Sequence, residues 1–466
     1  MAASASSSCA CLLILALGSV VIDAFVPPPA ARLQAKPPQS NPQQDTAGSL
    51  LGVSEKDTSV DSSTSPTTKG ALNRERFLEE LQLEAAQLDE HPNPHSATGT
   101  SSQQSSYWKF RGYDVFRQVA LPEEPRTGGP NAPAVILVHG FGCSTVYWRE
   151  TIQALTAQGY EVHALDLLGQ GRSAKPTPEQ WWPWHPVEYS LDLWAEQVDA
   201  YARENLDLGR PIVLIGNSVG SLVCLTAATG DFANGRRRED GAAGADAATF
   251  REDRCYLPYI RQHVVGIGEF NCGIGMNVRN ILKDPKWNPV QRWLLTGVFN
   301  VLETMVFDNT ALLAFVMDRL VTRDMLRKVL RDLYSCAPDP EAKIDEELVD
   351  SFYLPAKESA SPLVLRQILT NDAGLTPMEL HAKHGEFLDS LPIHAVWGDE
   401  DKVIPIQWQV PRFLQELSER EGNAVTMDVV HGGHILFDEC PEVSNGSMLA
   451  WLDSLKVSST CEPSQM

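Results

Sequence analysis

The sequence predicts an α/β protein in which helices cover a mostly parallel sheet and a helical cap is inserted into the sheet domain. Residues 134–138 (AVILV) and 211–215 (PIVLI) are continuous apolar runs, typical of strands that are buried on both faces. Helical patterns follow these runs, and such alternation implies right-handed crossovers in a parallel sheet. Residues 275–387 show helical patterns without clear strand patterns, which indicates the inserted cap.

The chain's size and charge exclude several classes of protein. It has 466 residues, 43% of them hydrophobic and 21% charged, so a large buried core is expected. The net charge of −22 disfavours nucleic-acid binding driven by bulk charge. Nine cysteines without a CxxC pair give no support for a zinc ribbon or a thioredoxin-type redox motif. We expect no bound metal and no cofactor.

The first hundred residues are predicted to be targeting segments. Residues 9–22 form an apolar stretch that is too short to span a bilayer comfortably, and residues 1–24 fit a signal peptide. Residues 25–106 begin basic, acid-free and rich in Pro and Gln, then become a polar linker that is expected to be disordered. A signal peptide is followed here by the pair Ala24-Phe25 and then by a transit-like segment. This order resembles the bipartite presequences of plastids acquired by secondary endosymbiosis. The alternative is a secretory protein with a linker.

The body of the chain is predicted to have two core parts around the cap. The first core part covers residues 107–274 and opens with an alternating hairpin at 107–121. Within it, residues 230–253 are of low complexity and charged, so we expect a disordered, solvent-exposed insertion. The second part covers 388–456, and 457–466 form a tail. Further expected strands lie at 161–167, 263–267, 393–397 and 425–430, and further expected helices at 151–158 and 189–206.

Ser218 is the candidate nucleophile. It lies in Gly216-Asn217-Ser218-Val219-Gly220, a G-x-S-x-G pentapeptide between a predicted strand and a predicted helix. This context is the one that a nucleophile elbow requires, because the sharp turn exposes the serine hydroxyl and the glycines avoid steric clashes. A structural turn serine is the alternative. A serine at this position favours acyl transfer to water, whereas an aspartate would indicate dehalogenase or epoxide-hydrolase chemistry.

A serine hydroxyl needs a base and an orienting carboxylate, and both candidates follow predicted strands. Asp401 lies three residues after Gly398, whereas Asp399 is expected to form the turn. His434 ends the segment 431–434 (HGGH), and His431 is the alternative base. The chain order serine, acid, histidine is the one expected for this architecture.

Two backbone N–H groups are candidates for stabilising an oxyanion. Residues 139–142 (HGFG) follow a predicted strand, and their glycines allow N–H groups to point inward. The N–H groups of Phe141 and Val219 are the expected donors. His139 is expected to stiffen this loop by hydrogen bonds, and Cys143 to be a packing residue.

These motifs together resemble the α/β-hydrolase superfamily from about residue 107 to residue 455. Residues 216–225 (GNSVGSLVCL) and 270–272 (FNC) are similar to plastid chlorophyll dephytylases and pheophytinases, which hydrolyse the phytyl ester of chlorophyll-type pigments. The resemblance implies a plastid carboxylic ester hydrolase with a hydrophobic pigment substrate. It is also compatible with peripheral association with thylakoid membranes. The insertion at 230–253 departs from the family pattern, and residues 272–275 leave substrate preference open.

The cap favours an apolar substrate independently of the resemblance. Aromatic and aliphatic residues crowd its first part, with Trp287, Trp293 and Phe299 as candidate substrate-binding residues. Ordinary cap packing is the alternative. The sequence leaves two other functions open. One is a plastid lipase or esterase that acts on galactolipids, and the other is a catalytically silent scaffold for pigment repair.

Overall fold

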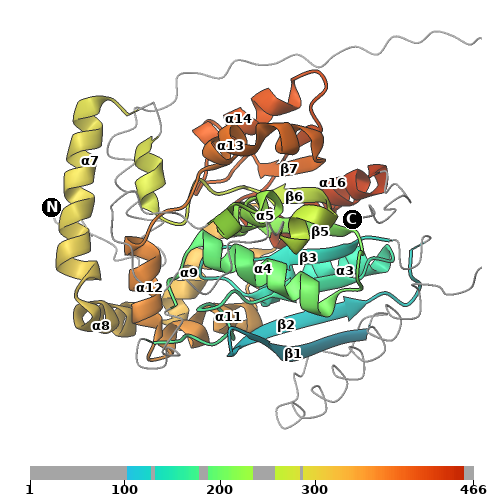
Figure 1. Cartoon of the computed structure of the whole chain (residues 1–466). Coiled ribbons are helices and arrows are strands. Elements are labelled where there is room, and N and C mark those ends of the chain that lie inside the picture. The colour runs from blue at the N-terminus through green and yellow to red at the C-terminus, as the bar shows by residue number, and fades with distance from the viewer. Residues whose placement is uncertain (1–101, 127–131, 178–186, 235–257, 284–286, 456–466) are drawn as a thin grey trace, which may run out of the picture.

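The computed structural model describes residues 102–126, 132–177, 187–234, 258–283 and 287–455. Its centre is an eight-stranded sheet in the order β1-β2-β4-β3-β5-β6-β7-β8 (Figure 1). β1 pairs with β2 and β2 with β4 in antiparallel fashion, and every other neighbouring pair is parallel. The predicted fold class is therefore confirmed. The strands are β1 (Ser102–Phe110), β2 (Tyr113–Leu121), β3 (Ala134–Val138), β4 (Val162–Leu165), β5 (Ile212–Asn217), β6 (Val264–Phe270), β7 (Ile393–Gly398) and β8 (Val425–Val430).

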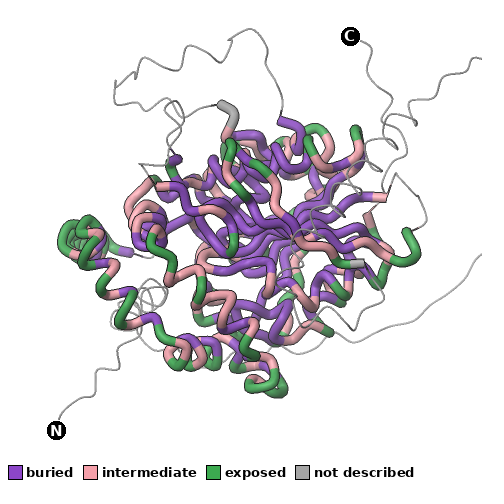
Figure 2. The backbone as a smooth tube through the Cα atoms, turned by 90° about the horizontal axis from the view of Figure 1, so that it is seen from below, coloured by how far each residue is buried: buried purple, intermediate pink, exposed green. Residues whose placement is uncertain are grey.

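Helices cover both faces of this sheet. On one face, helices pack into the hydrophobic cluster that contains Trp194 and Leu222, and on the other into the cluster that contains Trp148 and Phe437. Figure 2 shows the strands as the buried centre of the molecule. The first face carries α4 (Leu191–Asn205), α5 (Val219–Thr229), α6 (Tyr259–His263), α13 (Pro377–Ser390) and α14 (Gln409–Ser418), and the second carries η2 (Thr145–Trp148), α3 (Arg149–Ala157), α15 (Leu436–Glu439) and α16 (Pro441–Ser454).

The described residues between β6 and β7 form helices and no strand. α7 lies at the edge of the molecule, away from the sheet, and α8 joins its lower end at an angle (Figure 1). This segment comprises η6 (Val278–Lys283), α7 (Pro289–Leu302), the π-helical turn η7 (Glu303–Phe307), α8 (Thr310–Leu320), α9 (Arg323–Leu333), α10 (Pro340–Lys343), α11 (Glu346–Lys357), α12 (Ser361–Thr370) and α13.

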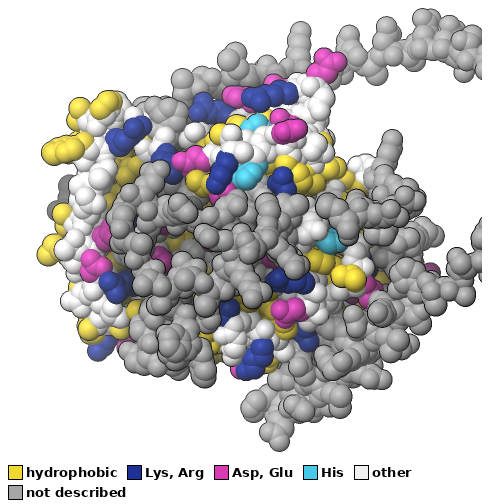
Figure 3. Space-filling model, in the orientation of Figure 1, with side chains coloured by type: hydrophobic (Ala, Val, Ile, Leu, Met, Phe, Trp, Pro, Cys, Tyr) yellow, Lys and Arg dark blue, Asp and Glu magenta, His cyan; other side chains and the backbone are white. Residues whose placement is uncertain are grey.

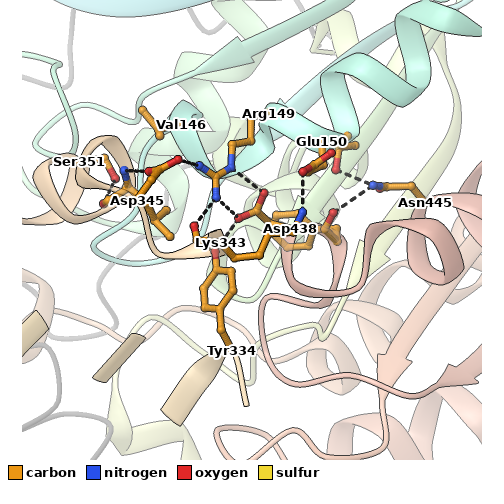
Figure 4. A network of polar contacts seen from close by, with 12 residues as sticks. Val146, Arg149, Glu150, Tyr334, Lys343, Asp345, Ser351, Asp438 and Asn445 are labelled. Carbon is orange, nitrogen blue, oxygen red and sulfur yellow. Dashed lines mark hydrogen bonds and ion pairs between the residues drawn. The ribbon is translucent and has the colours of Figure 1, made fainter. Parts of the chain in front are cut away.

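A half-buried arginine, Arg149, ties this helical segment to the sheet domain. Arg149, at the start of α3, donates to both carboxylate oxygens of Asp438 at 3.0 and 3.1 Å (Figure 4). It also donates to Asp345 and to the carbonyl oxygen of Lys343, both at 2.6 Å. Tyr334 completes the network by donating to Asp438 at 2.8 Å. Because the Asp438 side chain is fully buried, these charge-assisted bonds fix residues 343–345 firmly against α3 and α15.

Two predicted boundaries are wrong. Residues 102–106 were expected in the disordered linker, but they form the first half of β1, and Ser106 is buried and accepts a 2.8 Å hydrogen bond from Arg117. Their polar composition concealed a strand that is held by pairing with β2. Residues 230–234 were also expected to be disordered and exposed, but Gly230 caps α5 with φ 68° and η4 (Asp231–Asn234) packs against α4 and α5. Asp231 is buried and bonds to His384 at 3.0 Å. Residues 235–253, like the predicted presequence and the tail, lie outside the described residues.

Candidate active site

Ser218 occupies a strained turn between β5 and α5. Its backbone has φ 55° and ψ −122°, a conformation that non-glycine residues rarely adopt. A Cβ atom at Gly216 would lie 2.5 Å from the carbonyl carbon of Gly220, and one at Gly220 would overlap the carbonyl oxygen of Val138. The Ser218 N–H donates to the Phe270 carbonyl at 3.0 Å, which fastens the turn to β6. The two glycines are therefore required sterically, and the turn has the geometry of a nucleophile elbow.

Asp401 and His434 meet beyond the ends of β7 and β8. Asp401 Oδ2 lies 2.8 Å from His434 Nδ1, and both side chains are buried. The other carboxylate oxygen of Asp401 accepts the N–H groups of Val403 and Ile404 at 2.7 and 3.0 Å. Because both carboxylate oxygens make hydrogen bonds, the carboxylate is fixed in place. It can therefore hold the imidazole with Nε2 turned away from it.

The histidine loop packs directly against the elbow. Asn217, the residue before Ser218, donates its side-chain amide to the carbonyl oxygen of His434 at 3.2 Å. Among the described residues, no hydrogen bond joins the Ser218 hydroxyl to the His434 ring. Such bonds are often long in an enzyme before its substrate binds. The structure thus brings all three candidate catalytic residues to the same end of the parallel strands, although they are up to 216 positions apart in sequence.

Asn271 is a positioning residue to which the sequence analysis gave no role. It follows β6 with a positive φ of 46°, a region that asparagine tolerates better than most residues. Its side-chain N–H₂ donates to the carbonyl oxygens of Gly433 and His434 at 2.9 and 3.0 Å, and its oxygen accepts the N–H of Gly398 at 2.9 Å. One buried amide therefore joins the ends of β6 and β7 to the loop that carries His434. In the sequence, Asn271 stood out only as part of the segment 270–272 (FNC), which carries the family resemblance.

The loop after β3 presents the N–H of Phe141 between two anchored glycines. The N–H of Gly140 donates to the Tyr147 hydroxyl at 2.6 Å, and that of Gly142 donates to the Gln170 side chain at 2.7 Å. Gly142 has φ 72°, so the loop requires glycine at this position. The Phe141 N–H has no hydrogen-bond partner within the described part of the chain. It therefore remains a candidate donor to an oxyanion.

Val219 begins α5, and the first N–H groups of a helix have no acceptor within that helix. Its N–H is the second candidate donor. His139 has the supporting role that the sequence predicts, because its Nδ1 donates to the Gly140 carbonyl at 2.7 Å and its Nε2 accepts the Leu167 N–H at 2.9 Å. Burial lowers the pKa of His139, in agreement with a neutral ring that both donates and accepts.

The alternative residues occupy different positions. His431 is exposed and pairs with Asp399 at 3.1 Å, and Asp399 also accepts the N–H of Gly432 at 3.2 Å, as a turn former would. Cys143 is buried, and its thiol donates to the Phe141 carbonyl at 3.5 Å. In the ranges that the structure covers, no group of three His, Cys, Asp or Glu side chains could hold a metal ion.

The three candidate substrate-binding residues do not share one environment. Trp287 is buried, and its indole N–H donates to the Ile281 carbonyl at 3.0 Å. Trp293 is 73% exposed on the outer side of α7, and Phe299 is half-buried on the same helix. The structure therefore does not gather Trp287 and Trp293 into a common trough, since one is part of the packing and the other faces outward.

Glu269 is an unexpected buried carboxyl group beneath the elbow. It pairs in register with Gly216 of β5. Neither of its oxygens has a hydrogen-bond partner among the described residues, and burial raises its pKa to about 8. Burial and the adjacent Glu269 also raise the pKa of the Cys272 thiol. Both groups are therefore protonated near neutral pH, and Cys272 is not a competing thiolate nucleophile.

Glu269→Gln is expected to flatten the pH dependence of stability. The folded protein keeps the Glu269 proton up to about pH 8, whereas the unfolded chain releases it near the ordinary glutamate pKa. Stability is therefore lost as pH rises between these two values, by about 1.4 kcal/mol per pH unit at most. Urea unfolding at pH 5.5 and pH 8 should show a smaller loss in the variant. Glu416→Gln, on the exposed side of α14, should keep the wild-type slope, and an unchanged slope in Glu269→Gln would contradict the assignment.

Comparison with known proteins agrees with this geometry. The family model described as the alpha/beta hydrolase fold matches residues 133–229. The chloroplastic pheophytinase of Arabidopsis thaliana is 23% identical over 354 residues, which is 70% of this chain and 62% of that protein. The mesoderm-specific transcript homolog protein of Homo sapiens is 31% identical over 28% of this chain and 36% of that protein. The chain thus spans less than two thirds of either relative.

Among solved structures, haloalkane dehalogenase DbeA from Bradyrhizobium elkani is 18% identical, with a TM-score of 0.47, and the match covers 76% of this chain and 99% of that one. The family match covers β3, β4, β5 and α5, and it therefore includes both the loop of Phe141 and the elbow of Ser218. Together with the sheet order and the elbow geometry, this match shows that the chain has the α/β-hydrolase fold.

Proposed function

We propose that this protein is a plastid serine hydrolase that cleaves the phytyl ester of chlorophyll or a related pigment. The observation that carries the hydrolytic part is the 2.8 Å contact between Asp401 and His434, placed beside a strained serine elbow. The similarity to a chloroplastic pheophytinase over 70% of the chain supports the pigment ester and the plastid.

The proposed reaction proceeds through an acyl-enzyme. Ser218 Oγ attacks the ester carbonyl while His434 Nε2 takes the hydroxyl proton, and Asp401 stabilises the imidazolium. The N–H groups of Phe141 and Val219 donate to the oxyanion, which stabilises the tetrahedral intermediate. His434 then returns the proton to the phytol oxygen, and phytol leaves. Water, activated by the same imidazole, hydrolyses the acyl-enzyme and restores the Ser218 hydroxyl. Apart from the substrate ester and water, the steps of this cycle use the chain's own residues.

Product analysis tests this proposal. Purified protein is incubated separately with pheophytin a, chlorophyll a and monogalactosyl diacylglycerol, and the release of phytol and of fatty acid is measured. We expect phytol release from at least one pigment, at a rate well above fatty-acid release. Fatty-acid release alone would replace the pigment ester by a galactolipid ester. Failure of a fluorophosphonate probe to label the protein would favour a catalytically silent scaffold.

A further inference from the structure

The outer side of α7 and the turn that follows it carry an unusual set of exposed apolar side chains. Twelve large hydrophobic residues are exposed in the described part of the chain, and eight of them lie between residues 290 and 315. The other four are distributed over the rest of the surface. In Figure 3 the side chains at the left edge, where Figure 1 places α7, are largely hydrophobic. The eight are Val290, Trp293, Leu294, Val298, Val301, Met305, Leu312 and Phe315, and we call them the α7 surface.

The spacing of these residues gives α7 a second apolar face. Leu295 is buried toward the protein, with Phe299 and Leu302 half-buried beside it. The exposed residues recur three, four, seven and eight positions apart, and this spacing is the period of one helix face. That face is turned toward solvent. A helix at a protein surface needs only its inner face to be apolar. The outer face therefore indicates a partner that removes it from water.

Charge around the α7 surface points to a lipid bilayer as that partner. Residues 287–302 contain one charged residue, Arg292, in a chain whose net charge is −22. The acids at its border are neutralised, since Glu303 pairs with Arg279 and Asp308 pairs with Arg366 at 3.2 Å. Among the described residues no acid at the edge of this surface is unpaired, so the edge opposes phosphate-bearing headgroups with little electrostatic repulsion.

The shape of the segment fits a position in the interface and not across the membrane. Among the described residues no single helix is long and apolar enough to span a bilayer. Residues 289–307 and 310–320 pass that test only as a pair, and the two are bent by 87°. α7 has 14 residues and is about 21 Å long, which is shorter than the hydrocarbon core.

The α7 surface is also connected to the elbow by a short path. Gly273 lies against the backbone of Ser218, because a Cβ atom there would be 3.0 Å from the Ser218 carbonyl carbon. The chain then passes through η6 to Trp287 and into α7. Only fifteen positions separate Gly273 from Asn288, the residue that caps α7.

We propose that the α7 surface rests in the interfacial layer of a lipid bilayer and that the enzyme takes its apolar ester substrate from that bilayer. The substrate part rests on the proposed function, and the membrane part does not. A phytyl ester is itself dissolved in lipid, so a site held against the bilayer would meet it without a passage through water.

Vesicle binding by charged variants tests the membrane part. Full-length protein is mixed with phosphatidylcholine vesicles that contain no substrate, and the bound fraction is measured by flotation. All proteins carry Leu13→Glu and Leu15→Glu, so that the apolar stretch at 9–22 does not bind lipid itself. We expect the parent to bind, and Val290→Glu with Val301→Glu to lower the partition coefficient more than tenfold. Both substituted positions are exposed, so folding should be retained.

The matched control is Leu208→Glu with Val443→Glu, which adds the same charge at exposed apolar positions away from α7. This control should bind like the parent, and binding should persist in 1 M NaCl because the contact is apolar. Absence of binding by the parent, or equal binding by all three proteins, would overturn the proposal. So would sedimentation without lipid that shows a dimer in the parent and a monomer in the α7 variant.

An activity comparison separates this inference from the proposed function. The α7 variant should hydrolyse a short soluble ester, p-nitrophenyl butyrate, like the parent, but should release phytol from vesicle-embedded pigment at least fivefold more slowly. Loss of vesicle binding together with equal rates on embedded pigment would contradict substrate uptake from the bilayer. If no protein cleaves any ester while the α7 variant still fails to bind vesicles, the proposed function fails and the membrane surface stands.

Discussion

Replacement of Ser218 by alanine is expected to lower kcat for ester hydrolysis by a factor on the order of 10⁴ to 10⁶. The turn that holds Ser218 is imposed by the close approach of Gly216 and Gly220 and does not depend on the hydroxyl. Alanine can therefore occupy the same backbone, and the variant should fold and bind substrate while it lacks the nucleophile. Steady-state phytol release, measured with the fraction of protein that a fluorophosphonate labels, checks both points.

Ser221 provides the control on the same helix. It lies three residues after Ser218, is fully buried, and its hydroxyl has no hydrogen-bond partner among the described residues. Ser221→Ala removes a buried hydroxyl without removing the nucleophile, so we expect activity within about threefold of the parent and no loss of stability. Labelling that survives in Ser218→Ala, or that disappears in Ser221→Ala, would refute the assignment of Ser218.

The candidate site could be predicted from sequence because each of its parts has a local pattern. Ser218, Asp401 and His434 each follow a strand, and the ends of parallel strands meet at one edge of the sheet. Neighbouring glycines marked each turn. In the structure Asp401 lies 2.8 Å from His434, and the alternatives Asp399 and His431 form a separate, exposed contact.

The supporting contacts could not be predicted, because they join segments that are distant in sequence. Asn271 reaches the loop of His434 across 163 positions, and Glu439 accepts the N–H groups of Gly433 and Cys336, each at 2.6 Å. No local pattern distinguishes these residues from other polar residues. Composition was misleading for the same reason at residues 102–106, where pairing with β2 outweighs a polar sequence. Hydrophobicity alone also could not separate the buried Trp287 from the exposed Trp293.

Asp401→Asn is expected to lower kcat by about 10⁴-fold with little change in KM. Asp401 accepts three hydrogen bonds, one from the His434 ring and two from the N–H groups of Val403 and Ile404. Asparagine has one acceptor oxygen in place of two. If that oxygen keeps the two backbone donors, the amide N–H₂ faces Nδ1 and favours the tautomer with its proton on Nε2. His434 would then have no lone pair with which to take the Ser218 proton. Rates measured over substrate concentration separate this loss of kcat from weaker binding.

Asp399→Asn tests the same change two residues away, where the sequence left an alternative. The Asp399 side chain is partly exposed and, in the described part of the chain, bonds only to His431 and to the N–H of Gly432. An amide oxygen can accept from both of these groups, so we expect less than a tenfold loss of kcat. Equal unfolding midpoints for the two variants would show that the difference is chemical and not structural. If Asp399→Asn proved to be the inactive variant, the orienting acid would be Asp399 and the base would be its partner His431.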